Sequence, residues 1–203
     1  RLNIILANDL DGFISEIKSN RVMVLGSDRA WIKKTVEILW SKKIGVILIC
    51  AEPIELYGNI CVIKPDRSKI MLECMEYLVL ANRKKIALFG FNPSASSDSF
   101  RKEIFFDKAE ECGIDAANHD IYYNYGSVSD CFNEFIKNAS NYNGVICAND
   151  AVAVFLISSI KNYNINIPKD LYVMGNGNTR IGSLISPSLT TTTVNFDEVG
   201  RQS

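Results

Sequence analysis

The sequence contains a single histidine, His119, and its six cysteines include no C-x-x-C pair. Zinc and most other transition-metal sites take their ligands from clustered histidine and cysteine side chains. A histidine-based catalytic dyad needs a serine, cysteine or carboxylate partner at a recognised spacing, and His119 has none. The sequence therefore predicts no metal site, no cofactor and no enzymatic activity.

The chain also lacks an excess of charge of either sign, because 22 Lys and Arg residues stand against 23 Asp and Glu residues. Without a basic excess, this chain is not expected to bind nucleic acid by itself. No apolar run reaches the roughly 18 residues that a membrane-spanning helix requires, so no membrane contact is expected. An apolar fraction of 47% is typical of a soluble globular protein with a substantial core.

The cysteines are scattered along the chain, and four of them lie inside apolar patterns of strand or helix type. Cysteine in such a setting behaves as a small hydrophobic residue. Unpaired thiols are typical of reducing compartments, so a cytoplasmic protein with reduced, structural cysteines is expected. The six are Cys50, Cys61, Cys74, Cys112, Cys131 and Cys147.

Short β-rich runs alternate with segments of helical periodicity along the chain. Several runs are almost continuously apolar, which is typical of strands covered on both faces in a parallel sheet. Alternating strands and helices with right-handed crossovers predict an α/β fold with doubly wound parallel sheets. Strands are expected at residues 2–7, 22–25, 46–50, 60–63, 86–91, 145–148 and 171–174.

Helices are expected between these strands. Apolar stripes run through residues 70–81 and 152–160. Ser127 followed by Asp130 resembles a capping box that starts a further helix.

The polar segment at residues 81–85 separates a first α/β set from a second and predicts a crossover between two similar lobes. A second crossover is expected after Pro187, where a Thr-rich and Val-rich extended run redirects the chain. One lobe is then expected at residues 1–84 plus 192–203 and the other at residues 85–191. The chain begins in a strand-like run and stops in a helix-like one, so we expect it to be part of a longer protein.

Asn149 and Asp150 directly follow the apolar run at residues 145–148 and precede a helical stripe. One of the two is expected to cap the helix N-terminus, a position that both residue types favour. The other is expected to reach across the strand edge to a ligand hydroxyl. The alternative is that the pair has a capping role alone.

Arg101 lies near the first turn of the helix expected after the strand at residues 86–91. A cation is poorly placed there, because a helix N-terminus already carries partial positive charge. Such a guanidinium is expected to hydrogen-bond ligand oxygens or a carboxylate. A solvated surface arginine is the alternative.

A G-x-G sequence, Gly175-Asn-Gly177, follows the strand expected at residues 171–174. A tight turn is favoured over a phosphate-binding turn, because no third glycine stands at the required offset. Asp66 is expected either to face a binding cleft or to cap the next helix. Tyr125 and its neighbouring tyrosines are expected either to stack on a sugar or base, or to serve packing.

The order of these features resembles the effector-binding domain of the LacI/GalR family of transcriptional regulators, a periplasmic-binding-protein-like type I domain. The resemblance is specific from about residue 85 onward and weaker, though consistent in strand order, for residues 1–84. The matching segments are Ile86-Ala-Leu-Phe-Gly90 with the downstream Arg101, Val145-Ile-Cys-Ala-Asn-Asp150, Ile167-Pro-Lys-Asp-Leu-Tyr-Val-Met-Gly175 and Ser186-Pro-Ser-Leu-Thr-Thr191.

This resemblance implies two α/β lobes joined by crossover strands, with a sugar or related small molecule bound between them. It also implies a homodimer and an N-terminal headpiece, missing from this chain, that reads operator DNA. By position, Arg101 would hold ligand hydroxyl or carboxylate oxygens and Asn149 would hydrogen-bond a hydroxyl. Ser97 would add a contact, and Tyr125 would lie near the ligand.

The chain departs from the family pattern after the last of these strands. Asn176 and Gly177 stand where the family has an aromatic residue and an acid. The carboxylate that would accept two sugar hydroxyls is therefore missing, and Asn176 or Asn178 is expected to replace it in part. The full set of expected ligand contacts is Arg101, Asn149, Ser97, Asn176, Asn178, Asp66 and Tyr125.

The predicted function is that of a domain that senses a sugar or a related effector for a transcriptional regulator. The alternative is a solute-binding protein of a sugar transporter, which shares the fold. Six cysteines without an evident pairing pattern favour the regulator over the exported protein.

Overall fold

The computed structural model describes residues 10–26, 29–50, 58, 60–64, 66–117, 119–193, 195, 198, 200 and 201. The chain divides into two compact units. The first unit comprises Arg1–Pro65 with Asn195–Ser203, and the second unit comprises Asp66–Val194. The strand expected at residues 2–7 lies outside the described residues. The predicted fold class is confirmed, because both units contain parallel sheets with helices between the strands.

The first unit contains a three-stranded parallel sheet in the order β1-β2-β3. Helix α2 places Ile32, Val36 and Leu39 in the same buried core as Val46 and Leu48 of the central strand. The spacing of these helix residues puts them on one face, which explains why that face is buried. The elements are α1 (Leu10–Glu16), β1 (Arg21–Leu25), α2 (Arg29–Ser41), β2 (Gly45–Ile49) and β3 (Ile60–Ile63).

The second unit contains a five-stranded sheet in the order β5-β4-β6-β7-β8, and every pair in it is parallel. Its strands are β4 (Ile86–Phe91), β5 (Ile121–Tyr123), β6 (Gly144–Cys147), β7 (Tyr172–Asn176) and β8 (Thr190–Thr192). Its helices are α3 (Arg67–Leu80), α4 (Ser96–Lys108), α5 (Val128–Phe135) and α6 (Asp150–Ile160), with the 3-10 turns η1 (Ala139–Asn141), η2 (Lys161–Tyr163) and η3 (Arg180–Ser183).

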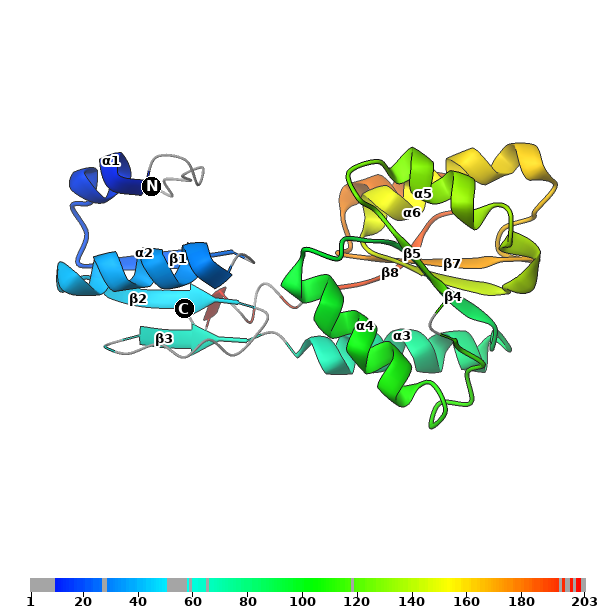
Figure 1. Cartoon of the computed structure of the whole chain (residues 1–203), viewed down its shortest axis with the longest axis horizontal. Helices are drawn as coiled ribbons and strands as arrows, with labels where there is room; N and C mark the ends of the chain where they lie inside the picture. Colours follow the sequence, from blue (N-terminus) through cyan, green and yellow to red (C-terminus); the bar gives the residue numbers. More distant parts are fainter. Residues whose placement is uncertain are drawn as a thin grey trace. The chain divides into compact units, whose positions relative to one another are not determined.

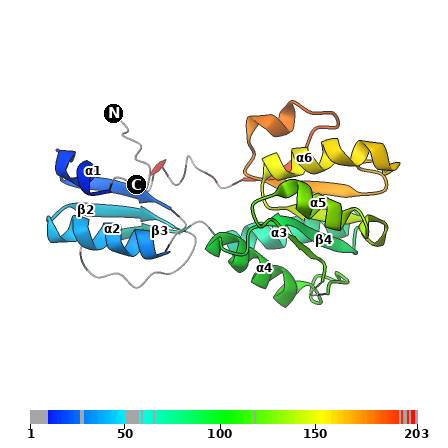
Figure 2. The same ribbon diagram turned by 45° about the horizontal axis from the view of Figure 1, so that its top comes forward.

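Helices cover both faces of this second sheet, α3 and α4 on one side and α5 and α6 on the other (Figures 1 and 2). Because side chains alternate along a strand, Ile86 and Leu88 of β4 join the core beneath α3 and α4. Ala87 and Phe89 join the core beneath α5 and α6. Burial on both faces explains why β4 is a continuous apolar run in the sequence.

Helix α3 belongs to the second unit, whereas the sequence placed it in the first lobe. Along the chain, the boundaries between the units fall at residues 65–66 and 194–195, and not at the expected 84–85 and 191–192. Met75 and Leu78 of α3 lie in the same buried core as Ile86 of β4 and Phe105 of α4. The stripe on α3 predicts that the helix is packed, but it does not specify the sheet against which it packs.

Two strands were not among those expected. β5 has only three residues, Ile-Tyr-Tyr, and contains two of the tyrosines for which stacking or packing is expected. β8 is formed by the Thr-rich run that was expected to be extended, and it pairs with β7 through Met174↔Thr190. The expected capping box is present, because Ser127 Oγ accepts a hydrogen bond from the backbone N–H of Asp130 at 3.2 Å.

Candidate functional site

The strand order of the second sheet reverses direction between β4 and β6. From β4 the chain passes through α4 to the edge strand β5, and from β6 it passes through α6 to β7 on the opposite side. In open parallel sheets, ligands bind outside the carboxyl ends of the strands at such a switch point. The loops that follow β4, β6 and β7 are therefore the candidate site.

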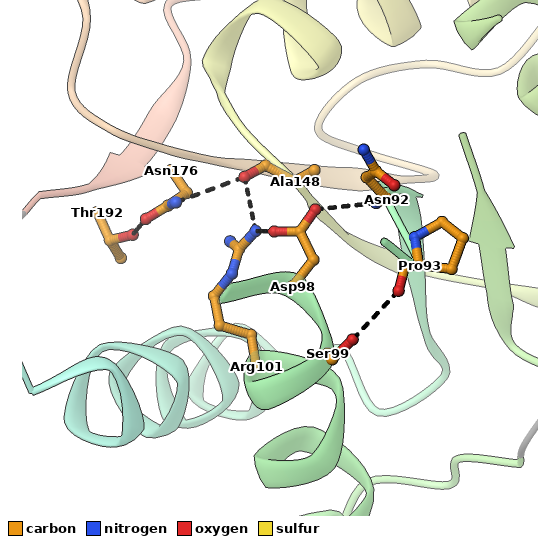
Figure 3. Close-up of polar contacts among 8 residues, drawn as sticks. All are labelled: Asn92, Pro93, Asp98, Ser99, Arg101, Ala148, Asn176 and Thr192. Carbon is orange, nitrogen blue, oxygen red and sulfur yellow. Dashed lines mark hydrogen bonds and ion pairs between the residues drawn. The ribbon is translucent and has the colours of Figure 1, made fainter. Parts of the chain in front are cut away.

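Arg101 lies at this edge and is buried, with 5% of its surface exposed. Its Nη2 donates to Asp98 Oδ1 at 2.6 Å and to the carbonyl oxygen of Ala148 at 2.9 Å (Figure 3). The guanidinium carbon lies 4.7 Å from the centre of the Phe91 ring, within the range of a cation–π contact. The alternative of a solvated surface arginine is thus wrong, and the carboxylate that was expected next to Arg101 is Asp98.

Asp98 joins helix α4 to the loop that follows β4. Its second oxygen, Oδ2, accepts the backbone N–H of Asn92 at 2.9 Å, while Oδ1 binds Arg101. A carboxylate in the first turn of a helix also interacts favourably with the helix dipole. The role of Asp98 was missed in the sequence, although the i,i+3 spacing of Asp98 and Arg101 on a helix was the available signal.

Asn176, at the end of β7, and Arg101 donate to the same acceptor, the carbonyl oxygen of Ala148. Asn176 Nδ2 donates to the carbonyl oxygen of Ala148 at 3.4 Å, and its Oδ1 accepts from Thr192 Oγ1 at 3.1 Å (Figure 3). Groups from α4, β7, β8 and the loop that follows β6 therefore converge on one point of the sheet edge. The structure brings together two of the expected contacts, Arg101 and Asn176.

Asn149 and Asp150 divide the two roles expected of them. Asn149 Oδ1 accepts the backbone N–H of Val152 at 2.9 Å, so Asn149 is the N-cap of α6. Asp150 is fully buried and reaches across the strand edge, but its partners belong to the protein. It accepts hydrogen bonds from the N–H and Oγ1 of Thr179 and from Oγ1 of Thr191. The expectation that a ligand hydroxyl would take this position is therefore wrong for Asp150.

The G-x-G sequence does not form the expected tight turn within itself: Gly175 and Asn176 are the last residues of β7, and the chain bends at Gly177. Gly177 has a φ of 128° and Asn178 a φ of 49°, both in the left-handed region. Gly175 is required for a different reason, because a Cβ at this position would collide with Asp150 Oδ1 and with Leu189. Asn178 is exposed, and its backbone N–H donates to Thr191 Oγ1 at 3.3 Å.

The other expected contacts, Asp66, Tyr125 and Ser97, are not joined to Arg101 by any described contact. Asp66 caps α3, because its Oδ1 accepts the N–H of Lys69 at 3.0 Å. Tyr125 is 80% exposed, and its ring centre lies 5.7 Å from that of Tyr123. Ser97 is half-buried in the first turn of α4.

Two hollows lie beside these loops, and Tyr123 lines both. The larger, of ≈ 320 Å³, lies along the edge strand β5, with Tyr125 and the acidic Asp130 and Glu134 among its lining residues. The smaller, of ≈ 40 Å³, is bounded in part by Asp98. The larger hollow is thus in the size range of small-molecule sites, whereas the smaller one is comparable to a single water molecule.

Arg67, the first residue of α3, is a further charged residue near this edge that was missed in the sequence. Its pKa lies below the ordinary value for arginine, chiefly because the guanidinium is partly buried. The positive charge of Arg101 lowers the pKa of Arg67 further, and the negative charge of Asp98 partly offsets this. Asp98 therefore acts electrostatically on two guanidinium groups.

Cys74 of α3 contacts Thr192, the residue that donates to Asn176, and its Sγ lies 3.9 Å from Thr192 Oγ1. Burial raises the pKa of this thiol to about 11, so it stays protonated at neutral pH. In the part of the chain that the structure describes, no group of three or more His, Cys, Asp or Glu side chains is arranged to hold a metal ion. None of the described helices is long and apolar enough to cross a membrane.

Comparison with known proteins places the chain in a family. Residues 75–203 match the periplasmic binding protein-like domain. The NTD biosynthesis operon regulator NtdR of Bacillus subtilis is 25% identical over 176 residues, which are 83% of this chain and 53% of that protein. A sucrose operon repressor of Escherichia coli is 25% identical over 68% of this chain and 44% of its own length. The chain thus spans about half the length of these curated relatives.

Solved structures share the fold. The LacI family transcriptional regulator CCPA from Weissella paramesenteroides, with bound sucrose, has a TM-score of 0.73 and 20% identity, over 95% of this chain and 71% of that chain. The family match covers more than half of the sequence. The chain therefore belongs to the periplasmic binding protein-like domain family.

Proposed function

We propose that this chain senses a small molecule for a LacI/GalR-type transcriptional regulator and does not catalyse a reaction. The observation that carries the proposal is the convergence of polar groups from α4, β7, β8 and the loop after β6 at the switch point of the second sheet. The effector binds at this carboxyl edge. It controls the binding of operator DNA by a headpiece outside this chain, in a homodimeric cytoplasmic protein.

The exposed polar groups at this edge favour a sugar or a sugar derivative. Asn149 and Asn178 are exposed; the Asn178 amide offers a donor and an acceptor to ligand hydroxyls, and Asn149, whose Oδ1 caps α6, offers the donors of its Nδ2. Ser97 adds a hydroxyl, Tyr125 adds an aromatic face, and the side chain of Arg101 positions the carbonyl of Ala148. The sucrose bound to the related regulator from Weissella paramesenteroides supports the same ligand class.

Asp66 and Asn176 contribute to the same proposed site in a supporting role. Asp66 fixes the start of α3, and Asn176 fixes the end of β7 relative to Thr192. To regulate, the effector must bind one conformational state of the protein more tightly than the other by a few kcal/mol. A ligand with equal affinity for both states does not change the equilibrium between them.

Calorimetric titration of the full-length protein with sugars, sugar phosphates and nucleobases tests the proposal. One member of the panel is expected to bind, and Asn149→Ala should weaken its binding about tenfold through the loss of one hydrogen bond to the ligand. Asn138→Ala is the matched control, since Asn138 is an exposed asparagine that precedes η1, on the connection entering β6 at the opposite edge. Absence of heat with every compound, or equal binding by the two variants, would count against the site.

The transporter alternative predicts a different behaviour. The relatives identified above are regulators, which favours a role in transcription. In a gel-shift assay with the full-length protein, the effector identified by calorimetry should change the affinity for operator DNA. An effector that binds but leaves DNA affinity unchanged would favour the solute-binding function.

A further inference from the structure

Arg101 is paired with a carboxylate of the protein itself, that of Asp98. The side chains of Arg101 and Asp98 are 6% and 13% exposed, and Arg101 Nη2 lies 2.6 Å from Asp98 Oδ1. A pair of this kind, removed from water, is screened little by salt. Nη2 of the same guanidinium also donates to the Ala148 carbonyl, and the group lies over the Phe91 ring, while its Nε is buried without a hydrogen-bond partner among the described residues.

Asp98 is held as firmly as Arg101. Its Oδ2 accepts the N–H of Asn92 at 2.9 Å, and its Oδ1 accepts from Arg101. Its position in the first turn of α4 adds the favourable interaction with the helix N-terminus. A ligand anion that approached Arg101 would have to break these contacts, or else lie beside a carboxylate of like charge.

From this arrangement we propose that Asp98 determines the specificity of the site, by reserving Arg101 and excluding phosphate and carboxylate groups from it. The effector is uncharged where it meets α4 and β6, and a neutral polyhydroxylated compound fits this description. This inference rests on the proposed function for the existence of an effector. The occupation of Arg101 by Asp98 itself does not depend on it.

The groups that remain accessible at this edge agree with a neutral ligand. Asn149 and Asn178 are exposed amides, and Ser97 is a half-buried hydroxyl. Asp150 is fully buried, and both of its carboxylate oxygens accept hydrogen bonds from threonines. The neutral amides and hydroxyls are therefore the accessible groups of the expected contacts, apart from the exposed Asp66, whose Oδ1 caps α3.

Arg67 makes the inference testable without any effector. Because Asp98 offsets the effect of Arg101 on Arg67, this one carboxylate acts on two cations. Asp98→Asn keeps the shape of the side chain and removes its charge. Two guanidinium groups would then remain near each other without an anion, and such a pair binds oxyanions well.

The experiment titrates inorganic phosphate into wild-type chain and into D98N, with phosphorus NMR as the readout and ionic strength held constant with chloride. D98N should bind phosphate about ten- to a hundredfold more tightly than wild type, as expected for one or two charge-assisted hydrogen bonds. D107N is the matched control, because Asp107 is an exposed residue of the same helix and its substitution changes the net charge equally. The double variant D98N/R101Q should lose the gain.

Two results of the phosphate titration would overturn the inference. One is saturable phosphate binding by the wild type that R101Q abolishes, which requires no other variant to fold. The other is a folded D98N that binds phosphate no better than D107N. If no compound of the calorimetric panel binds, but D98N binds phosphate more tightly than D107N and wild type, the proposed function is wrong and the inference that Asp98 occupies Arg101 stands. If a phosphorylated sugar binds wild type more tightly than its neutral parent, the function stands and the specificity is wrong.

Discussion

The buried carboxylate of Asp150 and the missing side chain of Gly175 depend on each other. Asp150 accepts three hydrogen bonds from Thr179 and Thr191, and no salt bridge to it occurs among the described residues. A Cβ on Gly175 would collide with its Oδ1 and with Leu189. We expect Asp150→Ala and Gly175→Ala each to destabilise the second unit, and their effects to be strongly non-additive.

The magnitudes follow from the contacts. Three hydrogen bonds to a charged acceptor contribute about 4–9 kcal/mol together. The cost of keeping an unpaired carboxylate out of water, several kcal/mol, opposes this, so Asp150→Ala should cost about 3 kcal/mol. Gly175→Ala introduces overpacking worth about 1–3 kcal/mol. In the Asp150→Ala background the carboxylate no longer obstructs the added methyl group, so at least about 1 kcal/mol of that cost should disappear.

Urea unfolding of the four proteins of this cycle measures the coupling. Trp31 and Trp40, the two tryptophans of the chain, both lie in the first unit, so their fluorescence does not report directly on the second unit. Tyrosine near-UV circular dichroism and hydrogen exchange of the amides in β7 and α6 follow the second unit. The steric reasoning is refuted if the double variant loses the sum of the two single losses to within about 0.5 kcal/mol.

Three further outcomes are expected. Asn149→Ala should lower the free energy of unfolding by about 1 kcal/mol through loss of the α6 cap, whereas Asn149→Asp should preserve it; equal losses in urea titrations would contradict the capping role. Phe135→Ala should cost about 3–5 kcal/mol, because this fully buried ring packs on three other aromatic rings; a cost below about 1 kcal/mol would show that the core assignment is wrong. A thiol reagent should label the exposed Cys61 in the folded protein, while Cys74 and Cys147, whose pKa values are raised by burial, react only after unfolding. Peptide mapping that found Cys147 labelled first would refute the buried placement.

The central strands and the helix stripes were predictable, because their signal lies in consecutive residues. β4 and β6 are apolar at every position, as strands with two covered faces must be. The caps of α5 and α6 were predictable for the same reason, since the cap side chain and the backbone N–H that donates to it are three residues apart. Local patterns of this kind need no knowledge of the rest of the chain.

Features that depend on distant residues were not accessible in this way. The sheet against which α3 packs is decided by contacts with β4 and α4, and its stripe of apolar residues is compatible with either unit. The partners of Asp150 are 29 and 41 residues away, so no spacing rule identifies them. β5 is too short to show a period, and two of its three residues are tyrosines, which also occur in loops.

The three threonines of β8 fix the register of that strand against β7. Thr190 contacts the Tyr172 hydroxyl, Thr191 donates to Asp150 on the other face, and Thr192 donates to Asn176. A slip of one residue would turn each hydroxyl to the wrong face and break all three contacts together. A force applied to the chain beyond residue 193 would therefore have to break all three contacts at once before β8 could move. We expect β8 to keep its register or to lose it in a single step, without intermediate positions.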